Sequence, residues 1–445
     1  MTQSVTPNAK ELIERFEDGT AGVGVIGMGY VGLPLAMLMV KAGYRTLGFD
    51  VDCEKVDRLN RGESYIHHFP VERIQEARKD GKFQATTDYA RLKEVEAIII
   101  CVPTPLNEYR EPDLSYVEAT GQSVGEHLRR GQIVILESTT YPGTTEEVLL
   151  ARLSESGLRV GQDFFLVYSP EREDPGNAHY NTRTIPKVLG GITRQCLAVG
   201  EAFYGRVFEK IVPVSSTAAA EMTKLLENIY RAVNIALVNE LKILADRMGL
   251  DIWEVIEAAS SKPFGYHAFY PGPGWGGHCI PIDPFYLTWK ARQFGFATRF
   301  IELAGEVNTG MPHFVVGKVV KALALRGISI AGAQILVLGM AYKRDVDDPR
   351  ESPAIKVVEL LREWHIDVSY HDPYIPHFPA GRHGDLGLSS VPLTPERLAE
   401  ADAVLILTDH SCIDYQDVVR HAKLIIDTRN ATRCVTEGRE RIIRA

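Results

Sequence analysis

The sequence predicts an α/β protein with two Rossmann-like doubly wound domains, joined by a long central helix and a helical dimerisation region. Short apolar runs alternate with polar helical stretches in the first half, and a helix without glycine crosses the middle. The strand–loop–helix pattern then returns near the C-terminus. At 445 residues the chain has room for two or three domains. We expect an N-terminal extension followed by three domains, at residues 1–20, 21–212, 213–325 and 326–445.

Composition and charge exclude several classes of function. The net charge of −9 argues against general attraction to nucleic acid or anionic lipid. No apolar run approaches the roughly 20 residues that cross a bilayer, and residues 1–20 lack the plan of a signal peptide. The 6 cysteines are scattered without a CxxC pair, which predicts reduced thiols. We therefore expect a cytoplasmic protein with no nucleic-acid partner, no membrane partner and no bound metal.

The first domain begins with a buried strand over residues 22–27, an apolar helix to about residue 43, and a second strand over 45–49 that stops at Asp50. Gly27, Gly29 and Gly32 permit a tight turn and close approach of the backbone to a pyrophosphate at a helix N-terminus. The Asp50 carboxylate accepts from a ribose 2′-hydroxyl and repels a 2′-phosphate. The pattern predicts an NAD site, with a glycine turn that binds nothing as the alternative. Further strands are expected at 97–102, 133–136 and 164–167.

The central helix is predicted over residues 215–248, which contain no glycine or proline. Apolar side chains recur there at helical spacing, at positions 222, 225, 226, 229, 233, 237, 241, 244 and 248. A helix of about 45 Å exceeds one small domain, so we expect it to link two domains and to offer the surface of a homodimer or higher homo-oligomer. Lys224 and Asn228 lie one turn apart on one face, where they can polarise a substrate oxygen or merely solvate a surface.

The C-terminal domain repeats the pattern without the phosphate fingerprint, with strands expected at 334–339, 367–370, 403–407 and 424–426. Gly339 is followed by Met-Ala-Tyr-Lys, so the glycines that admit a dinucleotide are missing. A mononucleotide bound by cations fits better, with Lys343, Arg344 and Arg350 meeting a diphosphate. The same cations have alternative partners in the neighbouring Asp345, Asp347 and Asp348.

One cysteine, Cys279, lies in a glycine-rich loop at residues 271–283. The glycines suit close approach to a substrate, and a helix expected over 285–293 stabilises a nearby thiolate. A small buried apolar residue is the alternative. A protease pair with His278 is disfavoured because adjacent side chains diverge, and a metal set of His278, Cys279 and Asp283 lacks a fourth ligand. A cofactor that removes hydride, together with a thiol that holds an acyl group, indicates oxidation past the aldehyde.

Polar side chains also close three strands of the first domain, at the edge where doubly wound sheets bind ligands. Glu171 in SPERED (169–174) is a candidate general base, with a salt bridge to Arg172 or Lys187 as the alternative. Thr139 in STTYPG and Thr104 in VPTP can contact the nicotinamide half of the cofactor.

Taken in order, these motifs resemble the UDP-sugar 6-dehydrogenases, which oxidise the C6 alcohol of a nucleotide sugar to a carboxylate. The resemblance runs from about residue 22 to 429 and includes GWGGHCIPIDP and GMAYKRDVDDPRES. It implies catalytic roles for Cys279 as nucleophile and for Asp283, Lys224, Asn228, Glu171 and Thr139. It implies that NAD is bound by Gly27, Met28, Gly29, Tyr30, Val31, Gly32, Asp50, Lys55, Thr104, Thr139 and Arg350. The implied substrate residues are Glu171, Lys224, Asn228, Tyr270, Gly272, Gly274, Gly276, Lys343 and Arg429.

Segments 169–177, 184–191 and 271–284 resemble the UDP-N-acetylglucosamine 6-dehydrogenases in particular. Glucose-type members carry an arginine well before the glycine loop, whereas this chain has no arginine or lysine between Lys262 and Cys279. We expect four-electron oxidation of UDP-N-acetylglucosamine through a thiohemiacetal and a thioester on Cys279, supplying precursors of surface polysaccharide. UDP-glucose and UDP-N-acetylmannosamine are alternative substrates. A two-electron alcohol dehydrogenase with a structural Cys279 and a non-catalytic NAD-binding protein are alternative functions.

Overall fold

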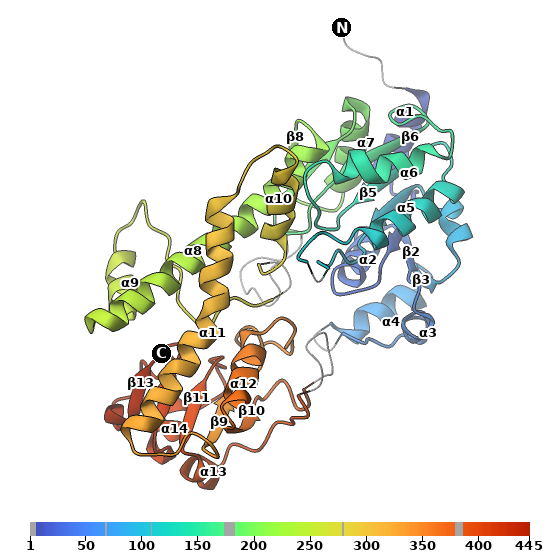
Figure 1. Cartoon of the computed structure of the whole chain (residues 1–445). Coiled ribbons are helices and arrows are strands. Elements are labelled where there is room, and N and C mark those ends of the chain that lie inside the picture. Colours follow the sequence, from blue (N-terminus) through green and yellow to red (C-terminus); the bar gives the residue numbers. More distant parts are fainter. Residues whose placement is uncertain (1–5, 67–68, 108, 173–182, 278–279, 379–385) are drawn as a thin grey trace. The chain divides into compact units, whose positions relative to one another are not determined.

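The structure is a computed structural model that describes residues 6–66, 69–107, 109–172, 183–277, 280–378 and 386–445. The chain divides into two compact units (Figure 1). The first contains residues 1–227 and 285–296, and the second contains residues 228–284 and 297–445. Two helices cross the boundary between them, α8 (Thr217–Met248) and α10 (Asp283–Arg292).

The first unit is organised around an 8-stranded sheet in the order β3-β2-β1-β4-β5-β6-β7-β8. Neighbouring strands are parallel except β6 and β7, which run antiparallel. The strands are β1 (Gly22–Ile26), β2 (Arg45–Phe49), β3 (Phe83–Thr86), β4 (Ala97–Ile100), β5 (Gln132–Leu136), β6 (Phe164–Tyr168), β7 (Lys187–Gly191) and β8 (Ile211–Val214).

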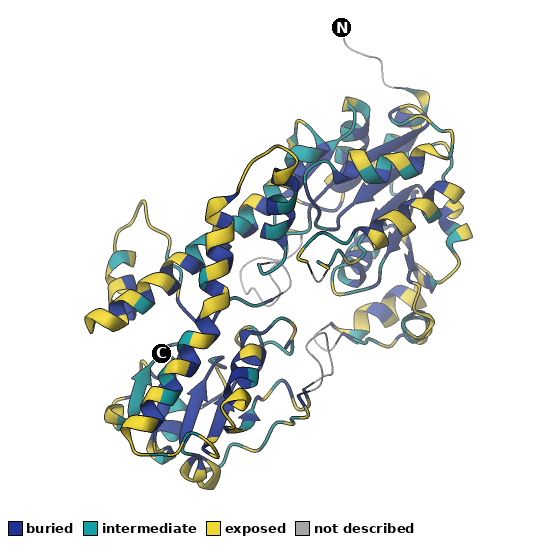
Figure 2. Cartoon of the chain, in the orientation of Figure 1, coloured by how far each residue is buried: buried dark blue, intermediate teal, exposed yellow. Residues whose placement is uncertain are grey.

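The central strands of this sheet are buried along their whole length, because helices cover both of its faces (Figure 2). Alternation of apolar and polar residues is therefore absent from β1, β4, β5 and β6, which are nearly continuous apolar runs. The helices are α1 (Pro7–Glu17), α2 (Gly32–Lys41), α3 (Cys53–Arg61), α4 (Val71–Lys79), η1 (Tyr89–Glu94), α5 (Ser115–His127), η2 (Thr145–Leu149), α6 (Leu150–Ser154) and α7 (Arg194–Gly205).

The second unit contains a 5-stranded parallel sheet in the order β10-β9-β11-β12-β13. Its strands are β9 (Gln334–Leu338), β10 (Asp367–His371), β11 (Ala403–Ile406), β12 (Ile425–Asp427) and β13 (Ile442–Arg444). Its helices, besides most of α8, are α9 (Ile252–Ser260), α11 (Arg299–Leu325), α12 (Pro353–Glu363), α13 (Pro395–Glu400), α14 (Tyr415–His421) and η3 (Arg439–Arg441).

The two sheets repeat one turn. Gly27 after β1 and Gly339 after β9 have positive φ values of 92° and 88°, and each packs against backbone that follows the adjacent strand. The carboxylate that closes the next strand accepts a hydrogen bond from the following methionine N–H in both units, Asp50 from Met28 and Asp372 from Met340. This repetition confirms the predicted fold class of two Rossmann-like domains.

Helix α8 buries polar side chains and exposes apolar ones (Figure 2). Its fully or nearly buried polar residues are Glu221, Lys224, Asn228, Asn239 and Lys242. The predicted apolar stripe lies largely on the outside, with Met222, Leu226, Leu237, Leu241, Leu244 and Met248 exposed. Burying a polar side chain costs free energy unless it is hydrogen-bonded. The buried polar face of α8 therefore indicates a role other than apolar core packing.

Within the described part of the chain, no helix combines the length and apolarity that a bilayer span requires. The described residues also form no cluster of three or more histidine, cysteine, aspartate or glutamate side chains that could hold a metal ion.

Candidate active site

The fingerprint turn has the geometry that a dinucleotide needs. A Cβ on Gly32 would lie 1.8 Å from the Gly27 carbonyl oxygen, so only glycine fits there. A Cβ on Gly29 would meet nothing within 4 Å, which leaves open space beside the backbone. Helix α2 begins at Gly32 without a side-chain cap. In its first turn the Leu33 N–H donates to the Gly29 carbonyl and Pro34 has no N–H, so the positive end of the helix dipole is what favours a phosphate there. The residues present therefore fit NAD.

The adenosine side of this turn is fixed by Asp50, which is buried. Its carboxylate accepts from the N–H groups of Met28 at 2.9 Å and Asp52 at 3.0 Å. The Lys55 ammonium lies 3.9 Å from it, and the Tyr65 hydroxyl donates to the Met28 carbonyl. Tyr65, which was not predicted from the sequence, thus also holds the turn, through the Met28 carbonyl.

The predicted nicotinamide-side residues lie on neighbouring loops. The Thr104 hydroxyl donates to the Thr139 carbonyl at 2.8 Å, and the Ser138 hydroxyl donates to the Val102 carbonyl at 2.7 Å. The Tyr286 hydroxyl of α10 donates in turn to the Thr104 carbonyl. Thr104 and Thr139 are therefore brought together, and the helix that follows the predicted cysteine loop is fastened to them.

Lys224 is buried against the loop that follows β6. Its ammonium donates to the Glu171 backbone carbonyl, and the Glu171 carboxylate lies 3.5 Å away. Arg172, the next residue, bonds to the Glu227 carboxylate at 2.6 Å and to the Pro186 carbonyl at 2.6 Å. Arg172, expected as an alternative salt-bridge partner of Glu171, thus pairs with Glu227. The Glu171 carboxylate lies beside the Lys224 ammonium.

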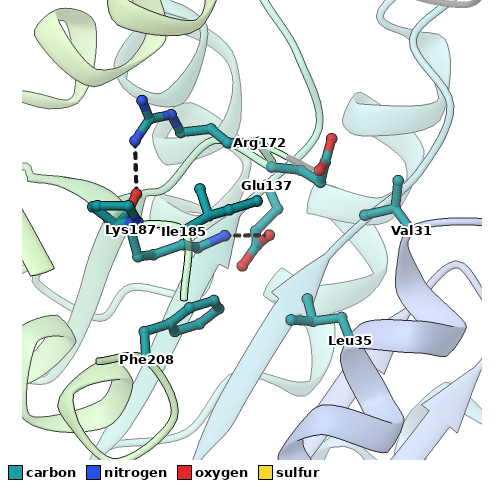
Figure 3. A pocket seen from close by; sticks show the side chains of 9 residues that line it. Val31, Leu35, Glu137, Arg172, Ile185, Lys187 and Phe208 are labelled. Carbon is teal, nitrogen blue, oxygen red and sulfur yellow. Dashed lines mark hydrogen bonds and ion pairs between the residues drawn. The ribbon is translucent and has the colours of Figure 1, made fainter. Parts of the chain in front are cut away.

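A small cavity opens behind this loop, between Val31 and Leu35 of the fingerprint turn and helix and the side chains of Glu171 and Lys187 (Figure 3). In its lining the buried Lys187 ammonium bonds to the Glu137 carboxylate at 2.7 Å (Figure 3). The same ammonium bonds to the Pro170 carbonyl at 3.2 Å. Lys187 therefore supports the backbone just before Glu171.

Asn228 and Asp283 are paired in the second unit. Both are buried, and the Asn228 amide donates to the Asp283 carboxylate while the Arg231 guanidinium donates to the Asn228 oxygen. Asp283 is the first residue of α10, where a negative charge is favoured by the helix dipole. The predicted nucleophile Cys279 and its neighbour His278 lie outside the described residues.

The glycine-rich loop packs against the carboxyl ends of the second sheet. Gly272 N–H donates to the Asn239 side chain at 3.0 Å, and a Cβ on Gly272 would lie 2.5 Å from the Arg429 guanidinium. Gly276 contacts Pro353 and Tyr342 closely, whereas Tyr270 is half exposed and stacks on Trp253. The predicted substrate residues Gly272 and Arg429 are thus neighbours. Gly274, also predicted, lies close to Asn308.

Arg429, predicted to bind the substrate, is held by the strand ends of the second sheet. Its Nε donates to the Leu407 carbonyl at 3.0 Å, and burial lowers the pKa of its guanidinium to about 10, partly offset by Asp427. Lys343 is exposed. Arg350, predicted to contact NAD, bonds to Asp348 at 2.7 Å, so the alternative ion pair forms there.

Sequence reasoning missed a set of buried polar residues that hold the site. Glu221 accepts three hydrogen bonds from the turn at 143–145, and Lys290 bonds to the Glu147 carboxylate. The only signal for Glu221 in the sequence is helical spacing, because it lies one turn before Lys224 on the same face of α8.

Comparison with known families assigns most of the chain. Residues 21–208 match the NAD binding domain of the UDP-glucose/GDP-mannose dehydrogenase family, residues 218–310 its central domain, and residues 336–433 its UDP binding domain. A UDP-N-acetyl-D-mannosamine dehydrogenase of Pyrococcus horikoshii is 38% identical over 92% of this chain and 95% of its own. A UDP-N-acetyl-D-glucosamine 6-dehydrogenase of Pseudomonas aeruginosa is 38% identical over 79% of this chain and 83% of its own.

Solved structures agree with these matches. The UDP-D-ManNAc dehydrogenase of Pyrococcus horikoshii superposes with a TM-score of 0.83 at 35% identity, covering 93% of this chain and 96% of the other. An NDP-N-acetyl-D-galactosaminuronic acid dehydrogenase of Methanosarcina mazei gives 0.81 at 30% identity, covering 99% and 98%. The chain belongs to the UDP-glucose/GDP-mannose dehydrogenase family and is an NAD-dependent oxidoreductase.

Proposed function

We propose that this member of the UDP-glucose/GDP-mannose dehydrogenase family oxidises the C6 hydroxyl of UDP-N-acetylglucosamine to the carboxylate, through a covalent intermediate on Cys279. The observation that carries the proposal is the buried polar face of α8. Lys224 meets Glu171 on this face, and one turn later Asn228 meets Asp283 at the start of the helix that follows Cys279. A core helix would have apolar residues at these positions.

The first oxidation needs a base and a hydride acceptor. NAD, when bound at the fingerprint turn, would supply the hydride acceptor, with a second NAD molecule replacing the first for the second oxidation. Lys224 in its neutral amine form, or a water that it holds with Asp283, takes the proton of the C6 hydroxyl as the hydride leaves C6, and the resulting ammonium can then donate to the substrate oxygen. The product of this step is the aldehyde.

The second oxidation needs the thiol, because an aldehyde releases hydride readily only from a tetrahedral adduct. The Cys279 thiolate adds to the aldehyde carbon, and the oxygen takes a proton to give a thiohemiacetal. Loss of hydride from that carbon and of the hydroxyl proton gives a thioester. Water positioned by Glu171, Thr139 or Asp283 then attacks the carbonyl, the C–S bond breaks, and the carboxylate and the thiolate separate.

Lys224 and Asn228 are the donors proposed for the oxyanions of these tetrahedral species, each worth on the order of 3 kcal/mol. In the second unit, Arg429, Lys343 and the loop from Tyr270 to Gly276 are proposed to hold the UDP moiety. The match of residues 336–433 to a UDP binding domain supports this assignment.

The N-acetylglucosamine substrate is proposed on three grounds: the segment likeness at 169–177 and 271–284, the absence of arginine and lysine between Lys262 and Cys279, and a relative that bears this activity in its name. Relatives named for N-acetylmannosamine make that sugar the second candidate. We also propose the three-domain division at 21–212, 213–325 and 326–445, and a cytoplasmic location.

A homodimer or higher homo-oligomer is proposed to form through α8. The stripe at Leu226, Leu237, Leu241 and Leu244 exposes between 40% and 60% of each side chain, an apolar surface that association would cover.

The test is to mix the purified protein with NAD and a panel of UDP-N-acetylglucosamine, UDP-N-acetylmannosamine and UDP-glucose, and to follow the absorbance of reduced cofactor. The highest kcat/KM is expected for UDP-N-acetylglucosamine, and no reduction with any sugar would sink the proposal. Cys279→Ser is expected to form no carboxylate, whereas Cys412→Ser, at an exposed cysteine, serves as the control. Normal carboxylate formation by Cys279→Ser would refute the covalent route.

A further inference from the structure

Glu221 is a buried acid that the proposed chemistry does not use. It lies on α8 with no exposed surface, and it makes three hydrogen bonds to the turn that follows Thr139. Its Oε2 accepts from Gly143 N–H at 2.6 Å, and its Oε1 accepts from the Thr145 N–H at 2.9 Å and from the Thr145 hydroxyl at 2.7 Å. The carboxylate therefore joins α8 to the start of η2.

The turn at 143–145 is built around this contact. Gly143 has a φ of 106°, and a Cβ there would lie 2.7 Å from the Glu147 carboxylate. The Gly143 and Thr145 N–H groups lie at the N-terminal end of η2, where backbone donors have no partner in their own helix. Glu221 supplies the missing acceptor from another helix, as a capping residue would.

The same segment is fastened to α10 by a second charged contact. Lys290 bonds to both oxygens of the Glu147 carboxylate, at 2.8 and 2.7 Å, and its ammonium lies 4.9 Å from the centre of the Tyr141 ring. Trp289 packs on Tyr141, with the ring centres 5.0 Å apart. The stretch from Thr139 to Glu147 is thus held by α8 on one side and by α10 on another.

We propose that Glu221 is a positioning residue for the reaction: by binding the Gly143–Thr145 turn, its ionised carboxylate holds Lys224 in place relative to the Thr139 loop. Lys224 lies one turn after Glu221 on the same face of α8 and bonds to the Glu171 carbonyl. A small displacement of α8 along this contact shifts the ammonium that the chemistry needs. The inference rests on the proposed function, because it assigns Lys224 a catalytic role.

The ionised form binds the turn most strongly, because it accepts from two backbone N–H groups and from the Thr145 hydroxyl at once. A proton on Oε1 would turn the Thr145 hydroxyl into an acceptor and would weaken Oε1 as an acceptor for the Thr145 N–H. The other ionisable groups around Glu221 are Glu147 and Tyr141 on the turn, Lys290 of α10 behind Glu147, and Lys224 on its own helix. Burial, the main cause, and Glu147, a minor one, raise the pKa of Glu221 to about 7, although the turn's hydrogen bonds lower it. Activity is therefore expected to fall as the pH drops through neutrality.

Glu221→Gln tests this inference, with Glu146→Gln as the matched control. Gln keeps the shape but replaces one acceptor oxygen by an N–H donor, which mimics the protonated acid. Glu146 lies on η2, the short helix whose start Glu221 contacts, and its side chain is exposed. We expect Glu221→Gln to lower kcat about 100-fold through misplacement of Lys224, to leave the KM for NAD within about threefold, and to abolish the loss of kcat near pH 7. Glu146→Gln is expected to behave as the wild type.

Two further measurements separate the possible outcomes. Thr145→Val removes a single hydrogen bond from the other side of the contact, and we expect it to lower kcat about fivefold in the same direction. Hydrogen exchange of the Gly143 and Thr145 amides, which needs no turnover, is expected to quicken in Glu221→Gln and not in Glu146→Gln. Wild-type kcat and pH profile in Glu221→Gln would overturn the inference. Failure of the wild type to reduce NAD with any UDP-sugar would instead overturn the proposed function. The hydrogen-exchange result would then still report whether Glu221 holds the turn.

Discussion

Two glycines of the fingerprint turn make opposite predictions when each is replaced by alanine. Gly29 and Gly32 lie on one turn and neither has a positive φ, so backbone strain is not the difference between them. A Cβ on Gly29 meets nothing within 4 Å, whereas a Cβ on Gly32 lies 1.8 Å from the Gly27 carbonyl oxygen. The first methyl group would occupy the space left for a ligand, and the second would collide with the protein.

The magnitudes follow from these distances. Gly32→Ala gains up to about 1 kcal/mol of helix propensity but forces the backbone apart at a cost of about 3 kcal/mol, so the net loss of about 2 kcal/mol lowers the Tm by roughly 5 °C. Gly29→Ala is expected to leave the Tm of the free protein unchanged and to weaken NAD binding 10- to 100-fold, or about 1.4–2.7 kcal/mol.

Thermal unfolding with and without NAD measures both effects. NAD at about 100 times its Kd stabilises the wild type by about 2.7 kcal/mol, and this protection is expected to fall to between about 1.4 and about 0.4 kcal/mol in Gly29→Ala at the same concentration. If Gly29→Ala bound NAD as tightly as the wild type, the open space beside Gly29 would not be the cofactor site and the reasoning would be wrong.

Two further predictions concern α8. Burial raises the pKa of Glu221 from 4.5 to about 7, so the stability that its protonated form contributes is full below pH 4.5 and is lost as the pH rises through 7. Over that interval the wild type is expected to lose on the order of 3 kcal/mol of unfolding free energy relative to Glu221→Gln. Parallel curves of unfolding free energy against pH for the two proteins, measured with denaturant, would contradict this prediction. The double variant Leu237→Glu with Leu241→Glu is expected to convert the proposed dimer into a monomer by light scattering, unlike Leu325→Glu, at an exposed leucine of α11; an unchanged mass would exclude this face.

Much of the fold follows from the sequence because the apolar runs of buried parallel strands are strong local signals. The strands starting at Gly22, Arg45 and Gln334 are found within a residue or two of their predicted ends. The strands β3, β7, β8 and β13 were not predicted, since polar residues, glycines or a proline interrupt their apolar runs and each depends on pairing with distant neighbours. The antiparallel pairing of β7 with β6 is likewise a tertiary property.

The candidate site was predictable where a motif fixes geometry. The fingerprint glycines and Asp50 are examples. Thr104 and Thr139 were placed at strand ends by their motifs, but the hydrogen bond between them was not predicted. Spacing alone could not show that the apolar stripe of α8 faces outward, because helical periodicity identifies two faces without saying which is buried. Nor could it show that Arg350 pairs with Asp348, or that Glu221 and Lys290 meet a turn more than 70 residues away.

The central claim is that one sugar loses four electrons on this enzyme before it is released. With limiting UDP-N-acetylglucosamine and excess NAD, the end-point absorbance of reduced cofactor counts the oxidations directly. The account predicts two NADH for each sugar consumed and a carboxylate as the product. One NADH for each sugar, with the aldehyde recovered, would contradict it.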